Sequence, residues 1–196
     1  MKKSFLLVVL FAASAAQTQN LKMISVRFPA NGSIPNTIQF LCSQNYDHAD
    51  CVKDATALRQ AMAPCPTQML GALSFVLVTA DEWKSLVRSQ GGDSVSPAFS
   101  MLDQRVTLLD ASLFSGSATR NKELIQRFSL MGPQLVDLAV THEMGHGICQ
   151  EKDERRADDY GKDLRNGNIP DCSKTPGRKQ TSLATNVPAA GSTSPR

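Results

Sequence analysis

Residues 141–161 read THEMGHGICQEKDERRADDYG. Two histidines, His142 and His146, stand four positions apart, and Glu143 follows the first of them. On an α-helix this spacing places both imidazoles on one face, one turn apart, which suits two ligands of a single metal ion. Zn–N bonds of about 2.0–2.1 Å leave little positional freedom, and a rigid helix meets that demand. The stretch therefore predicts a metal-binding helix.

An apolar segment leads into the two histidines. Pro133 suits the first position of a helix, and a helix over residues 134–146 carries Leu135, Leu138 and Ala139 on the face that continues to the histidines. We therefore expect the metal-binding turn to extend from the hydrophobic core.

Glu143 is the candidate general base. Its position on the helix points it partly away from the two imidazoles, so that it can reach a metal-bound water instead of the metal. A catalytic metal lowers the pKa of bound water to about 7 and polarises a carbonyl, while a nearby carboxylate transfers the proton to the leaving amine. The interpretation is hydrolysis of a peptide bond.

A catalytic zinc ion also needs a third protein ligand and an open fourth position. The only other histidine is His48, in a polar stretch where an exposed loop residue is expected, and Lys152 stands six residues after His146, where the metzincin pattern has its third histidine. The third ligand is therefore expected to be a carboxylate. The acidic run after the motif offers Glu151, Asp153, Glu154, Asp158 and Asp159.

A second helix in this acidic run would place Glu154 and Asp158 on one face. One of them can then bind the metal while the other accepts a hydrogen bond from a ligand histidine. Asp153 suits the N-cap, and the small residues Ala157 and Gly161 on nearly the same side would let this helix pack closely against the first. The spacing leaves open whether Glu154, Asp158 or Asp153 completes the site.

The strings HEMGH (142–146) and ERRAD (154–158) together resemble the gluzincin-type zincin metallopeptidases, in which HExxH is completed by a glutamate in an E-x-x-x-D helix. The longer string ERRADDYG is similar to the E-x-x-A-D-x-x-G form of small secreted and membrane-linked members, and the resemblance spans residues 104–165. It implies a zincin-like fold with Zn²⁺ as cofactor. The implied roles are zinc ligand for His142, His146 and Glu154, general base for Glu143, and hydrogen-bond partner of a ligand histidine for Asp158.

Only seven residues separate His146 from Glu154, fewer than in many gluzincins. The chain is expected to turn at Gly147 and to return with Glu154 in the first turn of the next helix. The resemblance further implies that a strand over residues 106–110 forms the sheet edge beside the cleft, where a peptide substrate adds as another strand. Tyr160 is a candidate for stabilising the tetrahedral oxyanion.

Alternating and continuous apolar runs predict the remaining elements, with NGSIPN (31–36) as a turn and GGDSVSPAFS (91–100) as a mobile loop. Strand and helix alternation before a helical C-terminal half predicts an α+β fold, here a small mixed sheet with an active-site helix and a C-terminal ligand-bearing helix. Predicted strands cover residues 22–28, 73–78 and 105–110, and predicted helices cover residues 50–63, 81–88 and 121–130.

The first residues are typical of a secretory signal peptide, since Lys2 and Lys3 precede an apolar run and small residues. That run is shorter than the roughly 20 residues that span a bilayer, so we expect a secreted or periplasmic protein without stable membrane insertion. The prediction is a signal peptide over residues 1–16, one zincin-like catalytic domain over 17–172 and a disordered tail over 173–196.

Charge and cysteine content constrain the partners and the compartment. Of the formal charge of +3, the leader contributes +2 and the tail after Cys172 contributes +4, which leaves −3 for the domain and argues against nucleic-acid binding. Five cysteines in an exported chain allow two disulfides at most. The expected pairs are Cys42 with Cys51 and Cys149 with Cys172, which leaves Cys65 free; pairing of Cys65 with Cys149 is the alternative.

Two functions fit these observations. The first is an exported, monomeric zinc metallopeptidase that acts on a peptide or protein. The second is a secreted binding or structural module in which zinc only holds helices together. A closed site with Asp158 or Cys149 as fourth ligand would favour the second function, and a vacant coordination position the first.

Overall fold

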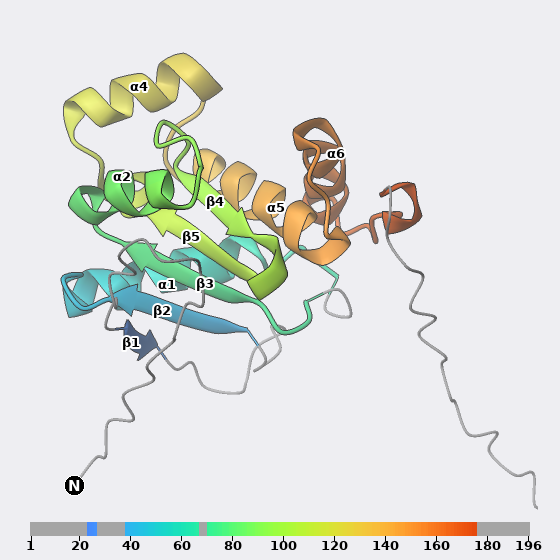
Figure 1. Ribbon diagram of the computed structural model, residues 1–196, viewed down its shortest axis with the longest axis horizontal. Helices are drawn as coiled ribbons and strands as arrows, with labels where there is room; N and C mark the ends of the chain where they lie inside the picture. The colour runs from blue at the N-terminus through green and yellow to red at the C-terminus, as the bar shows by residue number, and fades with distance from the viewer. Residues whose placement is uncertain (1–22, 27–37, 67–69, 176–196) are drawn as a thin grey trace, which may run out of the picture.

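A five-stranded mixed sheet and six α-helices build the described part of the chain (Figure 1). The structure is a computed structural model, and it describes residues 23–26, 38–66 and 70–175. The mixed α+β fold class predicted from the sequence is confirmed. From one edge to the other the strands are β1 (Met23–Val26), β2 (Gln39–Ser43), β3 (Ser74–Val78), β5 (Val106–Asp110) and β4 (Ala98–Met101).

The three central strands run parallel, and the two edge strands run antiparallel to their neighbours. The strand predicted at the edge, β5, lies instead between β3 and β4, so that prediction is wrong. The actual edge is β4, which the sequence placed inside a mobile loop. Its four residues follow a Gly- and Ser-rich segment and pair with β5 in the register Ala98 to Leu109. Strand β2 was not predicted at all.

Helices cover both faces of the sheet (Figure 1). On one face α1 (His48–Ala61) and α5 (Pro133–Cys149) pack on Phe75 and Leu77, whereas on the other face α2 (Ala80–Ser89) brings Trp83 against Val76. Because the inner strands are buried on both faces, they read as continuous apolar runs and not as alternating ones. The short α3 (Ser112–Ser115) and α4 (Ala118–Phe128) lie between β5 and α5 along the chain.

A capping box fixes the start of α2 directly after β3. Thr79 is the N-cap, and Glu82 three positions later accepts hydrogen bonds from the Thr79 amide at 3.1 Å and hydroxyl at 2.8 Å. The same carboxylate accepts from Ser43 Oγ at 2.5 Å and Asn45 Nδ2 at 2.7 Å, which ties α2 to the end of β2.

Both predicted disulfides are confirmed. Cys42 in β2 is bonded to Cys51 in α1, and Cys149 at the end of α5 is bonded to Cys172. Cys65 is the free cysteine among the described residues; its thiol is buried, and burial raises its pKa to about 11. Such a thiol is poorly reactive near neutral pH.

The described structure continues past the predicted domain end. A 3₁₀ helix, η3 (Cys172–Lys174), is followed by Thr175, which is buried, so the ordered domain extends beyond residue 172. The predicted signal peptide (1–16), the turn at 31–36 and residues 176–196 lie outside the described residues. None of the helices in the described ranges has the length and apolar character that crossing a bilayer requires.

Glycines set the distance between α5 and α6 (Glu154–Arg165). A Cβ atom on Gly161 would lie 2.9 Å from both the amide nitrogen of His142 and the carbonyl oxygen of Thr141, and one on Gly145 would lie 2.5 Å from the carbonyl oxygen of Ala157. These contacts are with backbone atoms, which cannot rotate aside. The close packing predicted at Ala157 and Gly161 is therefore present, and it brings the start of α6 beside the two histidines.

We expect Gly161→Ala to lower the free energy of unfolding by about 1–3 kcal/mol, because the new methyl group forces the two helices apart. Gly71→Ala is the control, since its Cβ would meet only the Arg105 side chain, at 3.7 Å. Urea denaturation of both variants checks the prediction. Equal midpoints for Gly161→Ala and the wild type would show that the helices are not in tight contact.

Candidate metal centre

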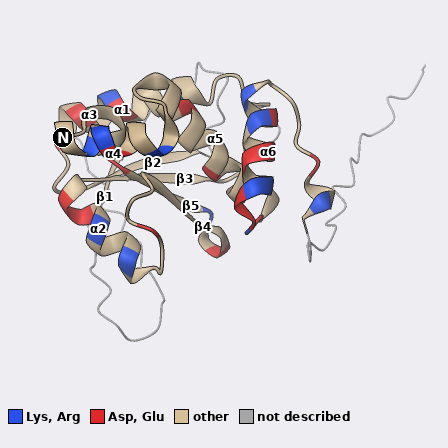
Figure 2. Ribbon diagram, turned by 90° about the horizontal axis from the view of Figure 1, so that it is seen from above, with Lys and Arg blue, Asp and Glu red and all other residues tan. Residues whose placement is uncertain are grey.

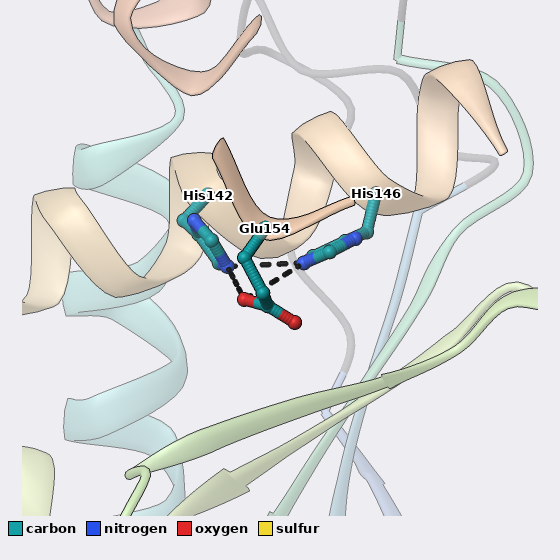
Figure 3. A group of neighbouring side chains, drawn as sticks. All are labelled: His142, His146 and Glu154. Atoms are coloured by element: carbon teal, nitrogen blue, oxygen red, sulfur yellow. Dashed lines mark hydrogen bonds and ion pairs between the residues drawn. The ribbon is translucent and has the colours of Figure 1, made fainter. Parts of the chain in front are cut away.

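Three side chains from α5 and α6 converge on one point (Figure 3). The Nε2 atoms of His142 and His146 lie 3.0 Å apart, and Glu154 Oε2 lies 3.1 Å from the first and 3.6 Å from the second. Ligand atoms at about 2.0–2.1 Å from a tetrahedral ion are about 3.3 Å from one another. The observed distances bracket this value, so the group could hold a metal ion without rearrangement.

Hydrogen bonds at the Nδ1 atoms orient both histidine rings. His146 Nδ1 lies 2.6 Å from the carbonyl oxygen of Glu151, which can only accept, so Nδ1 carries the proton. His142 Nδ1 lies 2.7 Å from Asp158 Oδ1, an acceptor when the carboxylate is ionised. With the proton on Nδ1 alone, each ring presents the lone pair of its Nε2 to the cluster. Asp158 thus has the position that the sequence predicted for it.

This arrangement concentrates electron lone pairs. When both rings carry their proton on Nδ1, two Nε2 lone pairs and a carboxylate oxygen face one another with no donor between them. Such a cluster is repulsive unless a cation occupies its centre. Two imidazoles and a carboxylate are a common donor set for Zn²⁺ and also suit other divalent transition metals. The donors alone do not select one metal.

The turn between the two helices differs from the prediction. Helix α5 continues through Gly147 to Cys149, which is buried and disulfide-bonded, and the chain reverses at Gln150 with φ 54°. Gly147 is therefore helical, and the predicted turn there is wrong. After the reversal Asp153 caps α6 by accepting from the Arg156 amide at 3.0 Å, as predicted. This places Glu154 in the first turn of α6, also as predicted.

The remaining acidic candidates do not join the cluster. Glu151 is buried and its carboxylate is engaged by other groups, with the Arg156 guanidinium holding its pKa down at about 2. Asp153 is used as the N-cap, and Asp159 is exposed at the cleft. His48 is exposed, as predicted, but it begins α1 and does not lie in a loop.

Glu143 lies beside the cluster without belonging to it. Only 5% of its surface is exposed, and burial raises its pKa to about 7, while Ser100 and the charge of His146 act in the opposite direction. Its backbone oxygen accepts a hydrogen bond at 3.2 Å from Ser100 Oγ on β4, which links the edge strand to α5. Glu143 and the ligands His142 and Glu154 line the same cleft.

That cleft has a volume of about 430 Å³ and lies between the start of β4, the end of α4, the first half of α5 and α6. Its apolar lining includes Phe128, Leu135, Leu138 and Ala139, and Arg127, Lys162 and Arg165 add positive charge. Acidic and basic residues both occur along α6 (Figure 2). The cleft therefore combines an apolar surface with the candidate metal ligands at one end.

Tyr160 does not reach this cleft. It is buried, it is not among the residues that line the cleft, and its hydroxyl lies 3.2 Å from Thr175 Oγ1. The structure therefore gives no support to its predicted role at an oxyanion. Cys149 is committed to its disulfide and Asp158 to the His142 ring, so neither is placed as a fourth ligand.

We expect the purified protein to bind one zinc ion per chain, and His146→Ala or Glu154→Ala to weaken binding at least about tenfold by removing a ligand. His48→Ala is the matched control, because that histidine lies outside the cluster and should leave the affinity unchanged. Titration against a chromophoric chelator measures all four proteins. Unaltered zinc affinity in Glu154→Ala would exclude this carboxylate as a ligand.

Comparisons of the chain with protein-family models, with curated proteins and with solved structures found no match. The case for a function therefore rests on the side chains described above.

Proposed function

We propose that the protein is an exported zinc-dependent metallopeptidase of the zincin type. The observation that carries the proposal is the convergence of His142, His146 and Glu154 at one end of a cleft that Glu143 also lines. Three protein ligands leave a coordination position for water, which is the arrangement of catalytic zinc sites. Zinc is the proposed metal because its catalytic sites commonly use two histidines and one glutamate.

Glu143 is the proposed general base. When bound, zinc would supply Lewis acidity toward water and toward the scissile carbonyl. The Glu143 carboxylate takes a proton from the attacking water and returns it to the leaving nitrogen. Burial keeps this side chain beside the cleft, and the Ser100 contact holds its backbone against β4. Asp158 and the Glu151 carbonyl keep the two ligand imidazoles in the tautomers that metal binding requires.

The edge strand supports a peptide substrate. Within the described residues β4 pairs with β5 on one side only, and its first residue, Ala98, lines the cleft. An extended peptide can add to such an edge through main-chain hydrogen bonds, which brings a peptide bond to the metal without sequence-specific contacts. The apolar cleft lining then favours a large apolar side chain next to the cleaved bond. The proposed substrate is thus a peptide or an unfolded protein segment.

Export is supported by the two disulfides, which persist in oxidising compartments. The proposed location is secreted or periplasmic, and the proposed active species is a monomer.

A non-catalytic zinc module is the second candidate. It is favoured by one observation: the cleft lining contains no tyrosine, and no histidine other than the ligand His142, to stabilise an oxyanion. In that case the metal would only join α5 to α6. The two candidates differ in turnover: a peptidase loses it when Glu143 is replaced, whereas a structural zinc module has none in the wild type.

We expect Glu143→Gln to bind zinc as the wild type does and to lower kcat for peptide cleavage by about 10²–10⁴-fold, because the amide cannot accept the proton. Cleavage of an unfolded protein, followed by mass spectrometry, measures turnover. Glu123→Gln on α4 is the control for loss of a carboxylate outside the cleft. Wild-type turnover in Glu143→Gln would refute the mechanism, and a zinc-loaded wild type without turnover would support the second candidate.

We expect Leu138→Trp to lower kcat/KM for peptides with a large apolar residue beside the cleaved bond more than for peptides with alanine there. The indole fills cleft volume that the large side chain would occupy. Ile125→Trp on α4 is the control, because Ile125 is 41% exposed and does not line the cleft. Equal losses for both peptide classes would place the substrate side chain elsewhere.

A further inference from the structure

Glu151 is the most thoroughly bound side chain of the turn between α5 and α6. It is 1% exposed, and its Oε1 accepts from the Lys152 amide at 2.8 Å, the Asp153 amide at 2.9 Å and Arg156 Nη2 at 3.0 Å. Its Oε2 accepts from Arg156 Nε at 2.7 Å and Thr175 Oγ1 at 2.9 Å. Five donors therefore hold one carboxylate, and they fix the path of the chain through the turn.

The main chain of the same residue contacts a metal ligand. The Glu151 carbonyl oxygen accepts from His146 Nδ1 at 2.6 Å, which leaves His146 Nε2 unprotonated toward the cluster. Glu154 follows three residues later as the first residue of α6, so its position depends on the backbone path of the turn. Glu151 therefore acts on two ligands at once, through its carbonyl on His146 and through its carboxylate on Glu154.

A distant segment completes this arrangement. Thr175, 7% exposed, follows η3, and the disulfide from Cys172 to Cys149 holds that segment against the end of α5. The Thr175 hydroxyl lies between Glu151 Oε2 and the hydroxyl of Tyr160. The C-terminal segment thus reaches the ligand-bearing turn through one hydroxyl group.

We propose that Glu151 is the positioning residue of the metal centre, and that Arg156 and Thr175 hold it in place. We call these three residues the Glu151 network. Glu151 contacts no metal; it sets the tautomer of His146 and the approach of Glu154, so its loss weakens metal binding through these two ligands. The proposal rests on the metal site of the proposed function and adds a residue to which sequence reasoning had given only the role of a candidate ligand.

Glu151→Gln separates this role from simple packing. Glutamine keeps the volume, but in either orientation its amide nitrogen would face an Arg156 N–H or the backbone N–H groups of Lys152 and Asp153, which can only donate. The turn must then shift to relieve donor–donor contacts. Groups that orient a metal ligand typically change metal affinity by 10- to 100-fold when replaced.

Glu82→Gln is a matched control. Glu82 is a partly buried carboxylate that, like Glu151, accepts several hydrogen bonds, here from Ser43, Asn45 and Thr79, but it lies in the capping box of α2 and not in the candidate metal centre. We expect Glu151→Gln to lower zinc affinity at least about tenfold and Glu82→Gln to leave it within about twofold. Unfolding midpoints of the metal-free proteins show whether the two variants lose comparable stability.

Thr175 supplies a second pair of variants. Thr175→Val removes the hydroxyl at nearly constant volume and is expected to lower zinc affinity several-fold, whereas Thr175→Ser keeps the hydroxyl and should bind as the wild type does. Equal zinc affinity in Glu151→Gln and the wild type would overturn the proposal. So would an equal loss of affinity in Glu82→Gln.

The tautomer of His146 gives a readout that needs no metal. In the metal-free wild type, long-range ¹H–¹⁵N correlations should show the proton on Nδ1, and in Glu151→Gln they should show a mixture of tautomers. A wild type that binds no zinc would refute the proposed function, while the tautomer signals would still decide the role of Glu151. An unchanged Nδ1–H signal in Glu151→Gln would overturn that role.

Discussion

The close contact between α5 and α6 is the constraint on which the candidate site depends. Gly161 lies against the backbone of Thr141 and His142, and Gly145 lies against the backbone of Ala157. Because backbone meets backbone, neither helix can slide without a clash or a void. The separation of the helix axes thus determines how close the Glu154 carboxylate comes to the two imidazoles. The geometry of the three candidate ligands therefore follows from the packing of the helices.

The hydrogen bonds around the cluster act with this packing. Asp158 and the Glu151 carbonyl orient both rings so that their Nε2 atoms face a carboxylate oxygen. A fold that places three electron donors together must be stabilised elsewhere, and the buried Glu151 carboxylate with its five hydrogen-bond donors supplies such stabilisation at the adjacent turn. The cluster and the carboxylate that holds the adjacent turn are therefore neighbours in the sequence.

The parts of this site that were predictable depend on local spacing. The i, i+4 pair His142 and His146, the capping residue Asp153 and the position of Glu154 in the first turn all follow from helix geometry, and the structure agrees with each of them. The position of the helix end did not follow, because Gly147 is helical and a non-glycine residue takes the left-handed conformation. A glycine in the sequence indicates where the chain can adopt a left-handed conformation, but tertiary contacts decide at which residue the helix ends.

Longer-range features could not be predicted from spacing. The edge strand β4 has only four residues after a Gly- and Ser-rich segment, so its identity depends on pairing with β5, and β2 escaped detection although it is largely buried. Tyr160 has a side chain that can serve in catalysis, but its hydroxyl contacts Thr175, a residue that follows α6 in the sequence. The Glu151 network joins residues up to 24 positions apart, and acidic composition alone gave no sign of it.

The bond between Cys149 and Cys172 encloses all of α6 in a covalent ring, since the two cysteines are 23 positions apart. In an oxidised but unfolded chain, the segment that carries Thr175 therefore stays tethered near Glu151, which is 24 positions away along the chain. Cross-linking a loop of this size removes about 3 kcal/mol of chain entropy from the unfolded state in the simplest polymer treatment. Re-forming the contact between Thr175 and Glu151 after denaturation should therefore be a local search, and a reducing environment would turn it into a search along 24 positions of chain.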